Sequence, residues 1–477
     1  MLNKTLQSRL EQLPGCELFT PTSSAFDEAR AIWNAMIERR PAAVVRCQSN
    51  EAVRIALLSA REAGCAISVK GGGHNIAGTA VSQGALMLDL SAMNAISIDP
   101  AARVANVQGG ATWAQFDASA QRHGLAAPGG VVSSTGVGGL TLGGGFGWQA
   151  RRRGLAADNL LEADVILANG ELITTSARNY PDLFWAIRGG GGNFGIVTRF
   201  HFRLHDVGPT ILFGPTFFSL DDAPTVLHAY AQMAGELPRE ACVWANIMTA
   251  PPLPALPEAS HGTKVLTLMQ FFGGDPTLGR KHLAPLYGGV RPLGDALAPR
   301  PFVEAQQFLD PTYAHGARNY WRSHNHLELS AGLIDTLVEL APDLPTPESE
   351  LLICQLGGAV AEVPNAESAF PHRQIPFIST PGVRWHSADD DAPTIEWLRN
   401  ASARIEAFSV PGRYVNFIAD TDDQSAAAYG PNLERLALVK STYDPNNVFH
   451  SNQNIVPVAS DTGPCDGREK QSPSPAT

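Results

Sequence analysis

One histidine in this chain directly follows three consecutive glycines. Because glycine has no Cβ, a ligand can approach such a backbone very closely. A histidine at this place would meet the ligand with a nucleophilic ring nitrogen, whereas an isolated histidine is by default a surface or hydrogen-bonded residue. The pattern therefore predicts a ligand site. Its residues are Lys70, Gly71, Gly72, Gly73, His74 and Asn75.

Two further glycine clusters follow, at 129–147 and 189–195. Successive backbone N–H groups in the first can cradle a pyrophosphate. The second matches G-x-G-x-x-G at 190–195, but a predicted helix precedes it and a predicted strand follows, the reverse of the Rossmann context. Glycine is costly in conformational entropy, so three neighbouring clusters favour a binding wall of another kind over purely structural turns.

Strands and helices must position these loops. Residues 42–47 predict a buried strand, Asn50 can cap a helix that runs to Ala63, and 65–69 predict the next strand. The glycine turn leaves the carboxyl end of this βαβ unit, where ligands bind in open α/β sheets. Further strands are expected at 85–90, 94–98, 103–108 and 194–204, and helices at 111–123 and 181–188.

Within 163–175, Asn169-Gly170 joins two apolar runs and predicts a hairpin with a type I′ turn. From about residue 206 the glycine clusters cease, and amphipathic helices alternate with strands such as 264–271 and 351–356. A last helix is expected at 431–442. This change in the sequence pattern indicates a second domain.

Bulk properties narrow the class of protein. A chain of 477 residues is too long for one ordinary core. The net charge of −11 argues against nucleic acid or an anionic membrane as a partner. We find no apolar run long enough to span a membrane and no signal-peptide core. The six scattered cysteines indicate reduced thiols, so we expect a cytoplasmic protein without a cysteine-based metal site.

Several motifs taken together resemble the berberine-bridge-enzyme-like family, which belongs to the vanillyl-alcohol-oxidase flavoproteins with a PCMH-type FAD-binding domain. The resemblance covers about residues 25–457. The motifs lie at 70–78, 138–147, 154–159, 182–197, 413–416 and 443–455.

The resemblance implies an α+β fold. An FAD-binding domain of two α/β subdomains would occupy residues 1–205, with its core at about 37–207. A substrate-binding domain with an antiparallel sheet covered by helices would occupy 206–410. A C-terminal segment, 411–457, would return to the FAD domain. The polar composition of 458–477 predicts a disordered tail.

By resemblance, His74 matches the histidine that bonds covalently to the 8α-methyl of FAD. Val132 stands where many relatives carry a cysteine with a second bond, and valine cannot form a thioether, so we expect one link only. Val137 matches a position where valine is typical of members that let oxygen reach the flavin.

The FAD-binding residues implied are the six of the glycine turn together with Gly78, Val132, Ser133, Ser134, Thr135, Gly136, Val137, Gly139, Gly143, Gly144, Gly145, Phe146, Gly147, Asp158, Asn159, Gly195, Ile196, Val197, Asn452 and Asn454.

Tyr414 and Asn416 match the family's catalytic Tyr-x-Asn strand, in which alternate residues face one side. Tyrosine, with a pKa near 10, needs help to act as a base near neutral pH. In relatives that help comes from a carboxylate or tyrosine on the strand after Phe-Pro-His-Arg. Here that strand offers Ser379 and Thr380 but neither group, so the usual partner is missing. The alternative is that Tyr414 only lines the pocket.

Tyr320, Trp321 and Thr380 are candidate substrate-pocket residues. His324 and His326 share one face of a predicted strand and could suggest a metal pair. Without other ligands in range, we expect no metal and treat both as exposed or pocket-lining polar residues.

The leading hypothesis is an FAD-dependent oxidase. It would take hydride from a C–H bond of a small organic substrate (an alcohol, sugar, amine or phenolic metabolite) to flavin N5, and O2 would restore the flavin and leave H2O2. A flavin-dependent tailoring oxygenase or cyclase of a biosynthetic pathway is the first alternative. A non-catalytic flavin-binding protein is the second.

Overall fold

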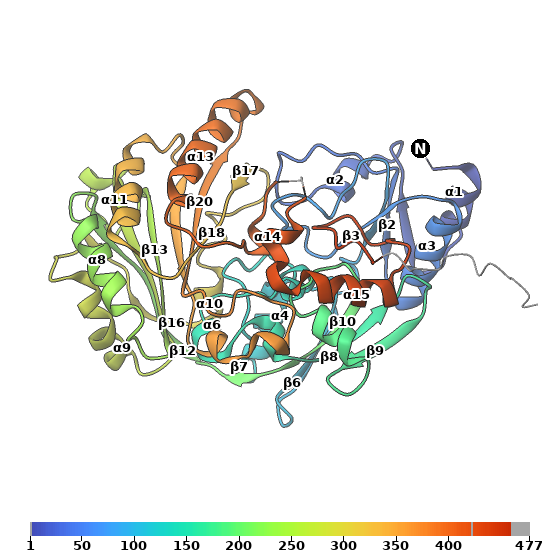
Figure 1. The fold of residues 1–477 in the computed structure, drawn as a ribbon, viewed down its shortest axis with the longest axis horizontal. Coiled ribbons are helices and arrows are strands. Elements are labelled where there is room, and N and C mark those ends of the chain that lie inside the picture. The colour runs from blue at the N-terminus through green and yellow to red at the C-terminus, as the bar shows by residue number, and fades with distance from the viewer. Residues whose placement is uncertain (1, 421–422, 459–477) are drawn as a thin grey trace, which may run out of the picture.

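The computed structural model describes residues 2–420 and 423–458. Two halves lie side by side in Figure 1, with the C-terminal helices α14 (Ser425–Tyr429) and α15 (Leu433–Tyr443) packed back on the N-terminal half. Apart from residue 458, the tail predicted to be disordered lies outside the described residues.

The first subdomain is built around a four-stranded sheet in the order β1-β2-β4-β3, in which β4 pairs in parallel with both β2 and β3. β4 therefore lies between the two strands of the predicted βαβ unit. The elements are α1 (Lys4–Glu11), β1 (Cys16–Phe19), α2 (Phe26–Arg30), β2 (Ala43–Cys47), α3 (Asn50–Glu62), β3 (Ile67–Lys70) and β4 (Leu86–Asp89).

Helix α3 packs its apolar face, including Val53 and Leu57, into the core of this subdomain. The predicted cap was wrong by one residue. Ser49, not Asn50, has the extended backbone of an N-cap, and its hydroxyl accepts the N–H of Ala52 at 3.2 Å. Both residue types cap helices well, so the sequence pattern alone could not separate them.

The second subdomain has a five-stranded antiparallel sheet in the order β5-β6-β10-β8-β9. Aromatic and aliphatic side chains of the helices α4 and α7 pack against it. The elements are β5 (Ile96–Asp99), β6 (Val104–Gln108), α4 (Trp113–Gln121), β7 (Leu125–Ala126), α5 (Val137–Leu142), α6 (Ala150–Arg153), β8 (Leu160–Ile166), β9 (Leu172–Ser176), α7 (Pro181–Ala186), β10 (Ile196–Arg203) and β11 (His205–Asp206), of which β7 and β11 form a separate pair.

Strands β8 and β9 form the predicted hairpin, but the predicted turn type was wrong. A type I′ turn needs positive φ at both central residues. Only Gly170 has it, at 84°, and Asn169 does not. The N–H of Gly170 instead donates to the carbonyl of Leu167 at 2.9 Å. The glycine therefore closes a longer connection in the left-handed conformation. The helix-before, strand-after context of 190–195 is confirmed by α7 and β10.

A nine-stranded sheet dominates the other half of the described chain, in the order β15-β12-β14-β13-β19-β20-β17, with β16 beside β12 and β18 beside β20. Every pairing in it is antiparallel, as predicted. Its strands are β12 (Thr210–Ser219), β13 (Ala241–Thr249), β14 (Lys264–Phe272), β15 (Gly294–Asp295), β16 (Ala298–Pro301), β17 (Arg318–Trp321), β18 (His324–His326), β19 (Glu350–Gln355) and β20 (Phe377–Trp385).

A layer of helices covers one face of this sheet (Figure 1). Because side chains alternate along a strand, Ala245 and Ile247 of β13 pack under the helices, while Asn246 and Met248 point toward the N-terminal half. The helices of this half are α8 (Ala223–Met233), α9 (Pro276–Leu283), α10 (Phe302–Gln307), α11 (Ala331–Leu340), α12 (Ala359–Glu362) and α13 (Asp391–Glu406), of which α8, α9, α11 and α13 form the outer layer.

A buried ion pair joins the two halves. Arg373, of the Phe-Pro-His-Arg motif, is fully buried and donates two hydrogen bonds to Asp158, each of 2.6 Å. Asp158 also accepts the N–H of Leu155. The carboxylate predicted to bind FAD is therefore committed to holding the domains together.

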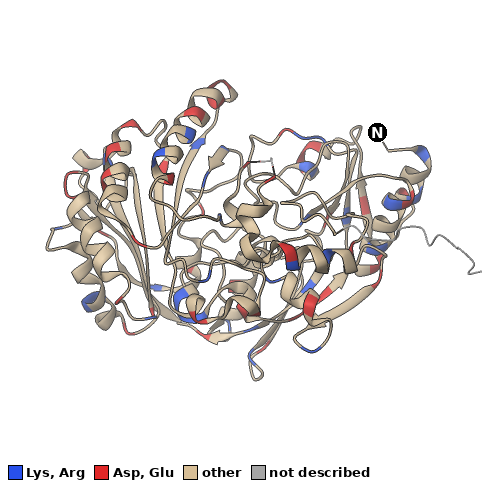
Figure 2. Cartoon of the chain, viewed as in Figure 1, with Lys and Arg blue, Asp and Glu red and all other residues tan. Residues whose placement is uncertain are grey.

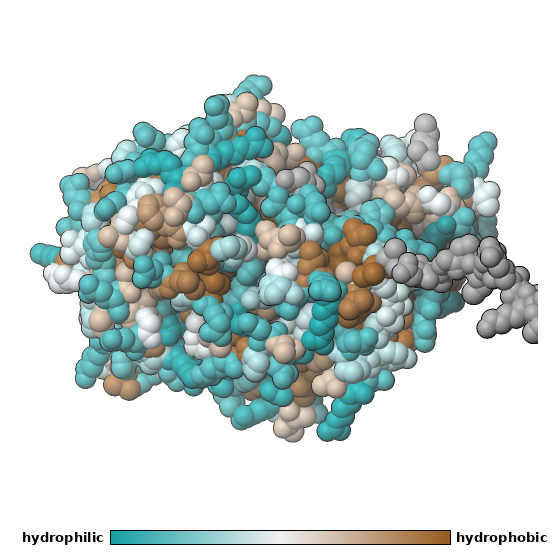
Figure 3. Space-filling view, viewed as in Figure 1, coloured by the Kyte–Doolittle hydropathy of each residue, from teal (hydrophilic) through white to brown (hydrophobic). Residues whose placement is uncertain are grey.

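The surface carries both signs of charge. Figure 2 shows acidic and basic residues interspersed on the face drawn, and Figure 3 shows that face as mostly polar with small apolar groups. Within the described ranges, no helix combines the length and hydropathy needed to cross a membrane.

A buried lysine fixes the C-terminal segment. Lys440 is inaccessible to solvent, and its ammonium donates to Asp444 at 2.7 Å and to the carbonyls of Asn193 and Phe449. Asp444 in turn accepts the N–H groups of Val448 and Phe449. The pair thus anchors the segment that carries α15 to the N-terminal half.

We expect Lys440→Met to lower the free energy of unfolding by about 3–5 kcal/mol, because it leaves the buried Asp444 carboxylate without its cation. The exposed Lys281 is the matched control, and Lys281→Met should change stability by less than about 0.5 kcal/mol. Urea unfolding followed by tryptophan fluorescence measures both. Equal midpoints for the two variants would show that the pair does not anchor the segment.

Candidate active site

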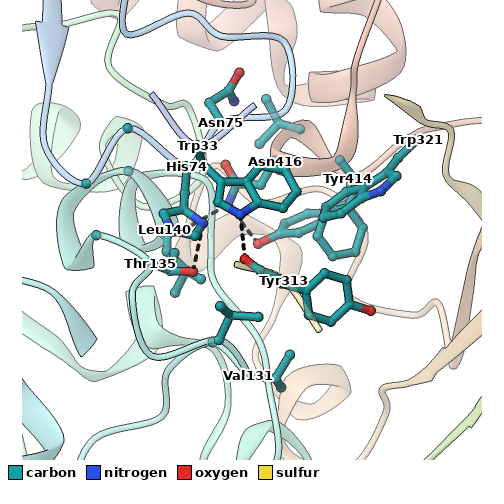
Figure 4. Close-up of a pocket in the computed structure, with 18 of the residues that line it drawn as sticks. Trp33, His74, Asn75, Val131, Thr135, Leu140, Tyr313, Trp321, Tyr414 and Asn416 are labelled. Carbon is teal, nitrogen blue, oxygen red and sulfur yellow. Dashed lines mark hydrogen bonds between the residues drawn. The ribbon is translucent and has the colours of Figure 1, made fainter. Parts of the chain in front are cut away.

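A cavity of about 650 Å³ lies between the glycine loops and the uncovered face of the nine-stranded sheet. Figure 4 shows side chains from both halves around it. The residues labelled there are Trp33, His74, Asn75, Val131, Thr135, Leu140, Tyr313, Trp321, Tyr414 and Asn416.

Two glycine loops touch at one wall of the cavity. A Cβ on Gly72 would lie 2.3 Å from the backbone N of Gly136, and one on Gly136 would lie 2.4 Å from the N of Gly72. Gly109 approaches the carbonyl of Val197 in the same way. No side chain fits at these positions, so the first two clusters meet backbone to backbone. Gly191, Gly192 and Gly195 of the third cluster line the same cavity.

His74 is held at this wall by four neighbours. Its ring stacks on Trp33, with centroids 5.4 Å apart and planes 19° apart, and meets the edge of His315 at 5.1 Å. The hydroxyl of Ser134 lies 3.0 Å from Nε2, and that of Thr135 lies 3.5 Å from Nδ1. The ring is therefore oriented before any ligand binds.

Burial, with a smaller contribution from the nearby His315, lowers the pKa of His74 to about 3. The imidazole is consequently neutral at ordinary pH, which is the form that can act as a nucleophile.

Many of the residues predicted to bind FAD line the cavity. These are Gly71, Gly72, Gly73, His74, Asn75, Val132, Thr135, Gly136, Gly139, Phe146, Gly195, Ile196, Val197 and Asn452. The others do not line it. These are Lys70, Gly78, Ser133, Ser134, Val137, Gly143, Gly144, Gly145, Gly147, Asp158, Asn159 and Asn454.

Several of the second group have other partners. The hydroxyl of Ser133 donates to Asp310 at 2.5 Å. The Lys70 ammonium donates to the carbonyl of Ala29. The amide of Asn159 donates to backbone carbonyls of its own loop. Val137 packs in the core of the second subdomain, so any effect it has on oxygen access is indirect.

The anion nest was predicted for the cluster 129–147, and within it the amides of 143–145 have other partners. The N–H groups of Gly143 and Gly144 donate to carbonyls within the α5 turn, and that of Gly145 donates to the Tyr414 hydroxyl. A Cβ on Gly143 would lie 2.3 Å from the side chain of Asn416. These glycines make room for the two predicted catalytic residues, and their amides are not free to bind a pyrophosphate.

Tyr414 and Asn416 are brought together, though not on a strand. Residues Val415–Phe417 form a 3₁₀ turn, which overturns the predicted strand. The Tyr414 hydroxyl accepts the amide N–H of Asn416 at 2.8 Å and the N–H of Gly145 at 3.2 Å. Both bonds use its oxygen, so its own hydrogen is free to be donated into the cavity.

Two of the three residues predicted for the substrate pocket line the cavity. Trp321 and Thr380 line the cavity, and the Thr380 hydroxyl has no hydrogen-bond partner. Tyr320 was predicted wrongly. As the neighbour of Trp321 on β17 it faces the opposite side, where its hydroxyl donates to Asp420 at 2.5 Å.

His324 and His326 are buried, not exposed or pocket-lining. His324 lies 2.8 Å from the hydroxyl of Ser402, and His326 lies 2.8 Å from that of Ser379. Within the residues that the structure describes, no group of three potential ligands surrounds a metal position.

The sequence reasoning missed Trp33 and Glu350, both of which line the cavity. Trp33 belongs to no motif, and only the tertiary fold brings it to His74. Glu350 had a usable signal: it stands at the start of an apolar strand, and alternation places it on the face of Leu352.

Comparisons with known proteins show the family of the chain. The FAD binding domain family matches residues 41–176, and the berberine and berberine-like family matches 413–456. The uncharacterized FAD-linked oxidoreductase YgaK of Bacillus subtilis is 30% identical over 441 residues, 91% of this chain and 95% of that protein. The (R)-6-hydroxynicotine oxidase of Paenarthrobacter nicotinovorans is 30% identical, over 93% and 97%.

Solved structures match over nearly the whole chain. The 6-hydroxy-D-nicotine oxidase of Arthrobacter nicotinovorans superposes with a TM-score of 0.84 at 27% identity, covering 95% of this chain and 99% of that one. Berberine bridge enzyme in complex with (S)-reticuline gives 0.85 at 23% identity, over 96% and 99%, which shows a shared fold.

The fold and site thus define an FAD-linked oxidoreductase. The chain belongs to the berberine-bridge-enzyme-like family of these enzymes.

The residues present fit FAD. The glycine wall admits a flat ligand at backbone distance, and the buried Ser68 hydroxyl and Asn452 carbonyl line the cavity without hydrogen-bond partners. Among the described residues, the lining from the N-terminal half contains no acidic side chain to repel a pyrophosphate.

We expect covalent flavin attachment to apoprotein to be as fast at pH 5.5 as at pH 7.5, since the neutral His74 ring persists down to a pKa of about 3. An ordinary histidine would lose its nucleophilic form below about pH 6.5. Acid-quenched samples, with bound flavin counted after denaturation, measure the rate. A decline with a midpoint near pH 6.5 would contradict this picture of the site.

Proposed function

We propose that the chain is an FAD-dependent oxidase whose flavin is bonded through its 8α-methyl to His74, with no second link at Val132. Its substrate is a small organic molecule with an oxidisable C–H bond. When bound, FAD supplies the hydride acceptor at N5 and the route by which O2 becomes H2O2. The observation that carries the proposal is the neutral, oriented ring of His74 at the glycine wall.

Tyr414 works as a hydrogen-bond donor in this proposal. Burial raises its pKa well above the ordinary value, so the phenol stays protonated near neutral pH and does not serve as a base. Its oxygen is occupied by Asn416 and Gly145, which aims its hydrogen at a ligand in the cavity. Asn416 is fixed in turn by the carbonyl of Leu140.

Oxidases among the relatives support this reading. Two such relatives are (R)-6-hydroxynicotine oxidase and xylooligosaccharide oxidase, the second being 38% identical over a segment of 182 residues. The sheet, Trp321 and Phe417 line the substrate side of the cavity, and the two aromatic rings meet edge to face with centroids 5.8 Å apart.

We expect His74→Ala to abolish covalent flavin, because no other histidine and no cysteine of the described residues lines the cavity. A denaturing gel viewed under ultraviolet light at acid pH shows covalent flavin as a fluorescent band. His123→Ala, an exposed histidine outside the site, is the control and should retain the band. Fluorescence that persists in His74→Ala would refute the covalent assignment.

Peroxide yield separates an oxidase from the alternative tailoring oxygenase. A screen of alcohols, sugars, amines and phenolic compounds, read as anaerobic bleaching of the flavin band, first provides a substrate. We then expect one H2O2 for each substrate oxidised and no oxygen from labelled O2 in the product. Labelled product with a low peroxide yield would favour the oxygenase.

A further inference from the structure

A single carboxylate faces the cavity from the nine-stranded sheet. Glu350 begins β19, is 9% exposed and lines the cavity. One of its oxygens accepts the hydroxyl of Tyr313 at 2.6 Å, and the other accepts the amide of Asn246 at 2.6 Å. Each carboxylate oxygen can accept a further bond, so the group is held in place without being saturated.

The neighbouring strand makes room for this carboxylate. Gly382 of β20 pairs with Glu350, and a Cβ on Gly382 would lie 2.9 Å from the Trp321 ring and 3.7 Å from Cγ of Glu350. Two pairs along, and so on the same face, Thr380 lies opposite Leu352. Thr380 is 4% exposed and its hydroxyl has no partner. Strand β20, where relatives carry a carboxylate or tyrosine, has neither group. Its Gly382 leaves space for Glu350 of the neighbouring strand β19.

The charge of Glu350 is not balanced inside the cavity. No lysine or arginine of the described chain lines it. Burial raises the pKa of Glu350 above its ordinary value, because the carboxylate is desolvated. Arg384 acts against this rise, but its guanidinium donates to Glu348, Asn319 and the carbonyl of Ala314. A buried carboxylate without a counter-ion is costly, and a cation on the ligand would remove that cost.

Apolar and aromatic groups surround the carboxylate. Trp321 and Tyr313 lie edge to face, 6.2 Å apart, and Trp244, Met269 and Leu352 line the same side of the cavity. Aromatic faces attract cations as well as apolar surface. The surroundings therefore suit a small apolar body that carries one positive charge.

We propose that Glu350 binds the protonated nitrogen of the substrate, and that the substrates are small apolar amines. This rests on the oxidase function proposed above. A hydroxyl group of an alcohol or sugar could also donate to the carboxylate, but it would leave the charge unbalanced.

Equilibrium binding to the flavin-loaded enzyme tests the proposal without requiring turnover. Benzylamine, benzyl alcohol and benzoate share one ring and differ in charge. Perturbation of the visible flavin absorption, recorded without oxygen in the first seconds after mixing, gives each Kd. The wild type should bind benzylamine at least about tenfold more tightly than benzyl alcohol, as expected for one charge-assisted hydrogen bond, and benzoate least of all.

Glu350→Gln should remove this preference while retaining covalent flavin, and Glu328→Gln, an exposed acid outside the site, should keep it. The proposal is overturned if the wild type binds benzyl alcohol or benzoate as tightly as benzylamine, if the amine causes no spectral change, or if Glu350→Gln keeps the preference. The order of the three Kd values in the wild type tests the proposal even if Glu350→Gln fails to load flavin.

Failure of the oxidase proposal has a different signature. It would appear in the wild type as a missing fluorescent band on the gel, or as very slow reoxidation by O2 after photoreduction. If the fluorescent band is normal and reoxidation by O2 is fast, but the amine is not preferred, only the role of Glu350 is contradicted.

Discussion

The contact between the backbones of Gly72 and Gly136 is the constraint on which the rest of the site depends. The two loops come from different subdomains, and at either position a Cβ would overlap the other backbone. This approach sets His74 beside Ser134 and Thr135, and it forms the wall against which a flat cofactor can lie. Glycine costs conformational entropy on folding, but at these two positions only glycine allows the backbones to approach.

On the opposite side of the cavity, the side chains are set by the alternation of faces along each β-strand. One face of the nine-stranded sheet is buried under helices. The other face is then free to present unusual side chains, including Glu350, Thr380 and Trp321. The buried pair of Arg373 and Asp158 holds this face against the FAD domain. Substrate recognition can therefore vary on the sheet while the cofactor wall stays the same.

Local patterns predicted the elements well, since apolar periodicity and glycine breaks are local. They predicted the strands around residues 42–108, the hairpin at 163–175 and the context of 190–195. They failed where two adjacent residues can play the same role, and where residues far along the chain determine the local structure. Ser49 displaced Asn50 as a cap, and only Gly170 adopted positive φ. The amides at 143–145 serve Tyr414 and their own turn rather than an anion, because residues far along the chain fold onto them. Trp33 reaches His74 by tertiary packing alone.

Peptide mapping of the purified enzyme tests the central claim most directly. After proteolysis, mass spectrometry locates any residue that carries covalent flavin. The account predicts one flavin-bearing peptide, with the modification on His74 and none on Val132 or any cysteine. Flavin found on another residue, or released intact on denaturation, would contradict it.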